Sequence, residues 1–143
     1  MNRIVIIHAG LRVPSSTKLL ADGFVSAMPE DDVRVVALRD HAHAIVDAML
    51  TGLVPDALAD VIGTVTGADA LVAVTPTFSA SFSGLFKSFF DILEPEVLKG
   101  MPVLLAATGG TARHSLMIDH SMRPMFAYLG AQAVRTGVFA ATE

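Results

Sequence analysis

Hydroxyl-bearing residues and glycines gather in three short segments of this sequence, and each segment directly follows a run of aliphatic residues. The segments are Ala9–Thr17, Thr75–Ser79 and Thr108–Thr111. Because the carboxyl ends of parallel strands lie along one edge of an open sheet, where such folds bind ligands, we expect the three loops to lie side by side. Their backbone N–H groups and hydroxyls suit a ligand that carries a phosphate and a polar heterocycle.

The first loop ends in three consecutive hydroxyl residues, Ser15, Ser16 and Thr17, where a helix is predicted to begin. The free N–H groups and positive dipole at the start of a helix form a favourable phosphate site. Simple helix capping by the same hydroxyls is the alternative, and spacing alone favours it. Arg12 is either a partner of the phosphate or a solvated loop residue.

The second loop contains Pro76, Thr77, Phe78 and Ser79. Its backbone groups can approach the polar edge of a flat ring, and Phe78 can flank that ring. The alternatives are that Pro76 terminates a strand in the ordinary way and that Phe78 belongs to the core.

The third loop reads Thr108, Gly109, Gly110 and Thr111. Paired glycines allow a ligand to approach the backbone closely, although a plain turn accounts for them equally well. His114 follows this loop and lies either near the ligand or at a helix cap.

Several kinds of site are excluded by residues that the sequence lacks. It has neither the G-x-G-x-x-G of a dinucleotide fold nor the G-K-[ST] of a P-loop. There is no cysteine, and His41 and His43 have no evident third ligand, so no metal site is expected. The net charge of −4 argues against nucleic-acid binding. Among ligands that carry a phosphate and a polar heterocycle, flavin mononucleotide (FMN) is not excluded by these absences.

Apolar runs that alternate with helical patterns predict an α/β domain with a parallel sheet. With five strands in this rhythm, we expect a flavodoxin-like doubly wound sheet of order 2-1-3-4-5 in one domain, residues 1–143. The second strand, which carries Arg34, is expected at an edge. The expected strands are 3–8, 33–38, 69–74, 103–107 and 133–139, and the expected helices start near residue 16 and span about 44–50, 55–65, 83–93 and 114–129.

Three features near the end of the chain lead to further expectations. Pro124 should kink or break the helix that contains it, because proline lacks a backbone donor. Unless that helix pairs with another chain, we expect it to expose Met117, Met122 or Phe126. The sequence ends at Glu143 without the final helix that such a domain usually has.

No apolar run reaches the length of a membrane span, and a cytoplasmic protein without membrane contact is expected.

The loop motifs also resemble a known family, the NADPH-dependent FMN reductases. Residues 76–87 are similar to that family's P-x-[YF]-x-x-x-[YF]-S-G-x-[LF]-K motif, and residues 107–114 to its A-T-G-G-T-x-x-H segment. Asp119 and Arg123-Pro124 resemble the D-x-x-[LM]-[KR]-P run that the same family has in the helix after this segment. The resemblance spans about residues 3–139 and is greatest to reductases that serve two-component monooxygenases. Gly10-Leu11-Arg12 differs from the more usual G-S-x-R, and His120 stands where some members have an interface tyrosine.

This resemblance implies a flavodoxin-like protein that transfers hydride from NADPH to FMN, with the reduced flavin passing to a partner monooxygenase. No side chain is expected to act as a catalytic acid or base, because the cofactor supplies the chemistry. A homodimer or homotetramer is implied. The residues implied in cofactor binding are Arg12, Ser15, Ser16, Thr17, Pro76, Thr77, Phe78, Ser79, Thr108, Gly109, Gly110 and Thr111.

Two other functions stay open at this stage. One is a flavodoxin-like electron carrier, although such carriers are more acidic and usually sandwich the ring with Trp or Tyr, whereas this chain has no Trp and a single Tyr, Tyr128. The other is an NADPH-dependent quinone or azo reductase that keeps its FMN tightly bound.

Overall fold

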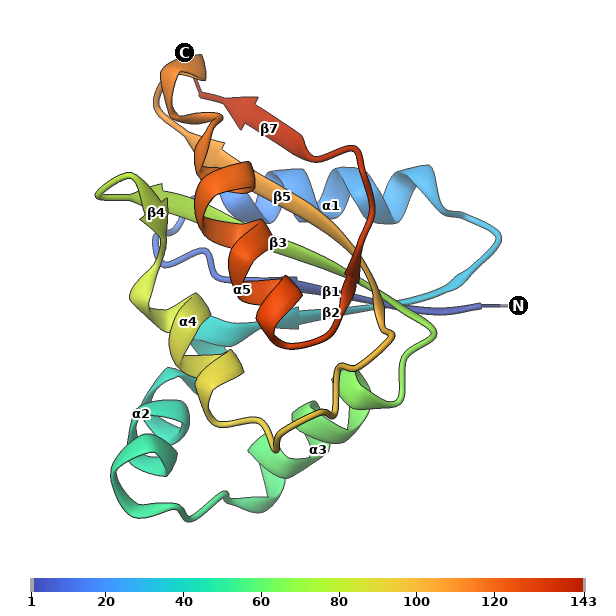
Figure 1. The fold of residues 1–143 in the computed structure, drawn as a ribbon, viewed down its shortest axis with the longest axis vertical. Helices are drawn as coiled ribbons and strands as arrows, with labels where there is room; N and C mark the ends of the chain where they lie inside the picture. Colours follow the sequence, from blue (N-terminus) through green and yellow to red (C-terminus); the bar gives the residue numbers. More distant parts are fainter. Residues whose placement is uncertain (1, 143) are drawn as a thin grey trace.

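A computed structural model describes residues 2–142, and its centre is a parallel sheet (Figure 1). The four long strands are β1 (Arg3–His8), β2 (Asp32–Ala37), β3 (Ala70–Phe78) and β5 (Pro102–Gly109). They lie in the order β2-β1-β3-β5, all parallel, so the predicted flavodoxin-like order is confirmed and β2 is at the edge. Because these four strands point the same way, the loops after β1, β3 and β5 meet at one edge of the sheet.

The predicted fifth strand is divided in two, so its prediction as one segment, 133–139, was wrong. The short strand β6 (Gln132–Ala133) pairs with the start of β5, and β7 (Val138–Ala141) pairs with its end. Between them the guanidinium of Arg123 donates hydrogen bonds to the carbonyls of Val134 and Arg135. These carbonyls therefore face a side chain instead of a neighbouring strand, and the ladder is interrupted.

Helices cover both faces of the sheet, which explains why its strands are almost uniformly apolar. The helix α1 (Ser16–Ala27) packs on one face, against a cluster that includes Ile6, Val72 and Ala106. The intervening strand residues, such as Val5 and Leu71, point to the other face and belong to a larger hydrophobic cluster. The elements over that face are α2 (Ala42–Thr51), α3 (Asp56–Thr66), α4 (Gly84–Asp91) and α5 (Arg123–Tyr128).

Phenylalanine packing anchors α4 beneath the second loop. Ser83 caps this helix, its Oγ accepting from the backbone N–H of Phe86 at 3.2 Å. Phe86 and Phe89 are fully buried, and the ring centroids of Phe90 and Phe126 lie 5.0 Å apart in an edge-to-face arrangement. Such pairs hold α4 and α5 together and fix where the hairpin before α4 leaves the sheet.

The segment from residue 112 to 128 is not one helix. It comprises a 3₁₀ turn η2 (Ala112–His114), a π-helical turn η3 (Ile118–Met122) and α5, with Pro124 in the first turn of α5. The predicted break is therefore confirmed. The expected exposure of this helix was wrong, because Met117, Met122 and Phe126 are all buried within the chain itself.

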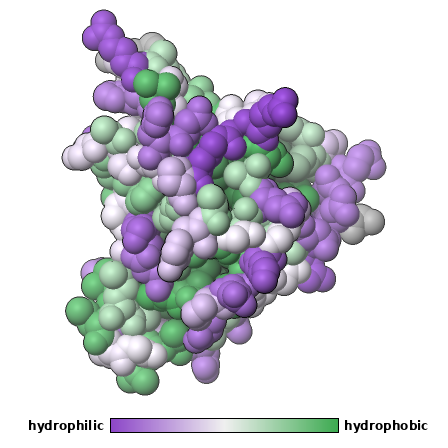
Figure 2. All heavy atoms as spheres, viewed as in Figure 1, coloured by the Kyte–Doolittle hydropathy of each residue, from purple (hydrophilic) through white to green (hydrophobic). Residues whose placement is uncertain are grey.

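Exposed apolar side chains concentrate instead on α2 and the loop after it. Val46, Met49, Leu50 and Leu53 are exposed there, Leu50 by 79%. Figure 2 shows this patch as the green region over α2 at the lower left. Within residues 2–142, no helix combines the length and the apolar character needed to cross a membrane.

Candidate functional site

One cavity of about 250 Å³ lies at the edge of the sheet where the three loops meet. It is lined by residues from the loops after β1, β3 and β5 together with one residue that follows β7. The lining residues are Leu11, Arg12, Pro14, Ser15, Ser16, Thr17, Pro76, Thr77, Phe78, Thr108, Gly109, Gly110 and Thr142.

All of the residues predicted from the three loops line this cavity except Ser79 and Thr111. Sequence reasoning missed Leu11, Pro14 and Thr142. The first two belong to a loop already singled out and could have been included with it. Thr142 lies far along the chain from the third loop, and β7 brings it there, where its backbone N–H donates to the Gly109 carbonyl at 2.8 Å.

The first loop is a tight turn into α1. Ser15 Oγ accepts from the backbone N–H of Lys18 at 3.1 Å, so the capping role considered for these hydroxyls is present. Gly10 lies so close that a Cβ built on it would be 2.3 Å from Ser15 Oγ. The cap satisfies the third N–H group of the helix and leaves those of Ser16 and Thr17 without partners in the helix, available to an anion.

A buried hydrogen bond ties the first loop to the third. Thr17 Oγ1 and Thr108 Oγ1 are 2.9 Å apart, and the two residues are only 2% and 3% exposed. Thr17 is therefore a link between α1 and the end of β5 as well as a cavity-lining residue. This bond sets the distance between the two walls of the cavity.

We expect Thr17→Ala to lower the free energy of unfolding by about 1–3 kcal/mol, because the buried Thr108 hydroxyl loses its partner. If the cavity binds FMN, the ligand expected from the sequence, the change should also weaken that binding by roughly 1–2 kcal/mol, the scale of a lost hydrogen bond. Denaturant unfolding and calorimetry measure the two effects. Thr17→Ser, the matched control, keeps the hydroxyl and should retain most of the stability and most of the binding affinity. A Thr17→Ala protein as stable as the wild type would contradict the proposed link between α1 and β5.

The second loop is wholly part of a hairpin, a structure that the sequence did not predict. Thr75–Phe78, expected as a loop, continues β3 and pairs antiparallel with β4 (Ser81–Phe82). The turn residues Ser79 and Ala80 have φ angles of 50° and 67°, which costs free energy for residues with a Cβ. Thr75 Oγ1 accepts from the Ser83 N–H at 3.1 Å and so joins the hairpin to the cap of α4.

Two neighbouring residues of the hairpin, Thr77 and Phe78, line the cavity. Thr77 Oγ1 is shielded from solvent yet has no hydrogen-bond partner within residues 2–142. A buried hydroxyl of this kind normally has a partner, so its environment fits a polar atom of a ligand. Phe78, which could have been a core residue, is 42% exposed and lines the cavity instead.

The two glycines of the third loop differ in their surroundings. A Cβ on Gly109 would come within 2.7 Å of the Phe139 ring, so β7 packs directly against this residue. A Cβ on Gly110 would meet no atom within 4 Å, and Gly110 does not have a positive φ. The backbone conformation therefore does not require glycine at 110, and the space beside it is open.

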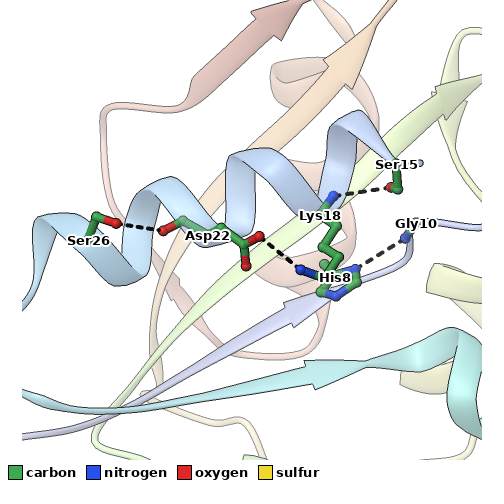
Figure 3. Close-up of polar contacts among 6 residues, drawn as sticks. All are labelled: His8, Gly10, Ser15, Lys18, Asp22 and Ser26. Carbon is green, nitrogen blue, oxygen red and sulfur yellow. Dashed lines mark hydrogen bonds and ion pairs between the residues drawn. The ribbon is translucent and has the colours of Figure 1, made fainter. Parts of the chain in front are cut away.

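His8 lies beneath the first loop, at the end of β1 (Figure 3). Its Nδ1 accepts a long hydrogen bond, 3.4 Å, from the Gly10 N–H, and Lys18 and Asp22 of α1 lie over the ring, paired with each other at 2.9 Å. Burial lowers the pKa of His8 from its usual value; Lys18 adds to the shift, and Asp22 and Asp40 oppose it. The lowered pKa favours the neutral ring, whose Nδ1 accepts the hydrogen bond from the turn.

We expect His8 to make the protein less stable in mild acid. Its pKa is lower in the folded state than the value of about 6.5 in the unfolded chain, so the unfolded state binds the proton first. The free energy of unfolding should therefore fall as pH decreases below about 6.5, until the folded pKa is passed. Urea unfolding across this range measures it. His8→Gln should flatten the dependence, whereas His43→Gln, at an exposed position, should not; an unchanged slope in His8→Gln would contradict the assignment.

Comparison with known proteins places this chain in a family. The family model described as "NADPH-dependent FMN reductase" matches residues 2–143. The NADH-dependent FMN reductase SfnF of Pseudomonas putida is 35% identical over 99% of this chain and 78% of that protein. An oxidoreductase from Corynebacterium diphtheriae has a structure with a TM-score of 0.92 and 43% identity, over 100% of this chain and 83% of that one.

A second solved structure, the apo form of an NADH:FMN oxidoreductase, has a TM-score of 0.87 and 30% identity, over 99% of this chain and 76% of that one. These likenesses run through all three loops that surround the cavity. With its flavodoxin-like strand order, this chain therefore belongs to the NADPH-dependent FMN reductase family and is an oxidoreductase that uses FMN and a nicotinamide nucleotide.

Proposed function

We propose that the cavity binds FMN and that this chain reduces it with NAD(P)H. The observation that carries the proposal is the convergence of three polar loops on one cavity that contains the unpartnered Thr77 hydroxyl. The donor set fits the group. Backbone N–H groups and a cation are available for a phosphate, and a hydroxyl and open glycine backbone for a polar ring.

In this proposal the helix start and the guanidinium of Arg12 hold the phosphate. Ser16 and Thr17 supply backbone N–H groups, and Arg12 is exposed at the rim of the cavity, where it can form a charge-assisted pair. The buried Thr17–Thr108 bond keeps this wall in register with the third loop. These contacts bind and orient the ligand without any proton transfer.

The ring lies between the hairpin and the third loop. Thr77 donates or accepts at the polar edge of the ring, and the exposed ring of Phe78 shields its side from water. Gly110 leaves one face open so that a nicotinamide ring can stack there. FMN supplies the hydride-accepting chemistry when it is bound, and the chain contributes position and exclusion of water.

The exposure of the site favours release of the flavin. Arg12 and Gly110 are exposed and Phe78 is 42% exposed, so the proposed flavin position is open to solvent on this side. No Trp is present to close over the ring. We infer that reduced flavin leaves for a partner flavin-dependent monooxygenase, in contrast to an electron carrier or a quinone reductase that keeps its FMN.

Stopped-flow mixing of the protein with NADPH, NADH and free FMN tests this proposal. We expect nucleotide oxidation that requires added FMN and turns over many equivalents of it. Activity without added FMN, with flavin retained through gel filtration, would favour the quinone or azo reductase. No oxidation of either nucleotide would overturn the proposal.

A cytoplasmic homodimer or homotetramer is proposed for the assembly. The support is the exposed apolar face of α2, because such a patch is uncommon on a monomer. Sedimentation at micromolar concentration measures the state, and a monomer would contradict it.

A further inference from the structure

A second cavity, of about 160 Å³, is lined by residues that follow the second and third loops of the candidate flavin site. Its lining residues are Ala80, Arg113, His114, Leu116, Met117 and His120. Ala80 is in the turn of the hairpin that carries Phe78, and Arg113 follows Gly110 by one short turn. The second cavity therefore lies beyond the same two loops that flank the proposed ring position.

Within the part of the chain that the structure describes, the polar side chains that line this cavity all belong to Arg and His residues, which can be cationic and donate N–H groups. Arg113, His114 and His120 are all exposed, and Met117, 3% exposed, forms an apolar floor. Among residues 2–142, no carboxylate lines either cavity, although the chain has a net charge of −4. Basic residues thus line both cavities, Arg12 in the first and Arg113 in the second, on a protein of net negative charge.

The carboxylate nearest in sequence is already engaged. Asp119 Oδ1 forms an ion pair with Arg123 Nε at 2.6 Å. The same arginine donates a hydrogen bond to the Val134 carbonyl, in the segment that connects β6 to β7. Arg113 belongs to none of the ion pairs found among residues 2–142. Its guanidinium is therefore free to form a forked pair with an anion, the geometry that suits phosphate.

We propose that this second cavity binds the diphosphate of the nicotinamide nucleotide, with Arg113 as its principal contact. The inference rests on the proposed function and assigns a subsite of it. In the nucleotide only one ribose separates the nicotinamide from the diphosphate, which matches a cavity whose Arg113 lies one short turn after Gly110 along the third loop. The 2′-phosphate of NADPH is carried by the adenosine ribose, on the far side of the diphosphate from the nicotinamide, and fits this neighbouring position less well.

Three hydride donors test the assignment: NADH, NADPH and N-benzyl dihydronicotinamide, which has no phosphate. Arg113→Gln should lower the ratio of kcat/KM for NADH to that for the benzyl donor by about tenfold or more, the effect of losing a charge-assisted hydrogen bond. The ratio for NADPH should fall equally. Arg135→Gln removes one positive charge from the exposed crossover between β6 and β7 and should leave both ratios unchanged.

Other patterns of change would overturn the proposal. A loss confined to NADPH would assign Arg113 to the 2′-phosphate, and equal losses with all three donors would mean a structural effect. Circular dichroism and melting temperature of Arg113→Gln confirm that the fold is retained, as expected for an exposed side chain.

A binding measurement separates this subsite from flavin reduction itself. Calorimetry with ADP-ribose, which has the diphosphate and no nicotinamide, should give a Kd about tenfold or more weaker for Arg113→Gln than for the wild type, with FMN affinity unchanged. Equal ADP-ribose affinities would overturn the proposal. If the wild type reduced no FMN with any donor, the proposed function would fail, and this titration would still decide the subsite.

Discussion

Gly110→Val should abolish NAD(P)H oxidation, by about 100-fold or more, while the fold is retained. A branched side chain at Gly110 fills the open space beside the proposed ring position, and misplacing a stacked donor has effects of this size. The melting temperature should change little, because Gly110 is exposed, lacks a positive φ and has room for a Cβ. Steady-state oxidation of NADPH and thermal unfolding, measured on the same preparation, check both parts.

The neighbouring glycine is the matched control for this result. Gly109→Ala places a Cβ within 2.7 Å of the Phe139 ring, so it should lower the melting temperature because β7 must shift. The two glycines thus separate an effect on the ligand from an effect on packing. Full activity in Gly110→Val, or a melting temperature reduced as much as in Gly109→Ala, would mean that the pair serves only the turn.

FMN should bind at least 100-fold more tightly than riboflavin. The phosphate gains charge-assisted hydrogen bonds at the start of α1 and from Arg12, each of about 1.5–3 kcal/mol, and a factor of ten corresponds to about 1.4 kcal/mol. Isothermal titration calorimetry with the two flavins measures the difference.

A charge variant ties that difference to the first loop. Arg12→Gln should weaken FMN binding and leave riboflavin binding nearly unchanged, because only FMN carries the phosphate. Arg39→Gln, which removes an equal charge from the 3₁₀ turn η1 (Leu38–His41) outside the cavity lining, should affect neither flavin. Equal affinities for FMN and riboflavin in the wild type would remove the phosphate site from this loop.

The sequence by itself determined the order of elements and the loops that form the site. Uniformly apolar runs such as 70–74 are typical of strands covered on both faces, and Ser15 and Ser83 are effective caps, so the starts of α1 and α4 were predictable. Once the strands are parallel, their carboxyl ends must share an edge, which is why three separated polar segments could be assigned to one site. These properties depend on local pattern and on a general rule of chain topology.

Only the tertiary structure decided what lies between those loops. Thr142 reaches the cavity because β7 returns alongside β5, and the fifth strand is divided because Arg123 takes two of its carbonyls. The hairpin turn at Ser79 and Ala80 contains no Gly or Asn, the residues from which its positive φ angles could have been predicted. The packing of the 3₁₀ and π turns buries Met117. It also places Arg113 and His120 in the lining of one second cavity. Such contacts link residues distant in the chain, and their free energies depend on shape and distance in the folded state, so no periodicity in the sequence encodes them.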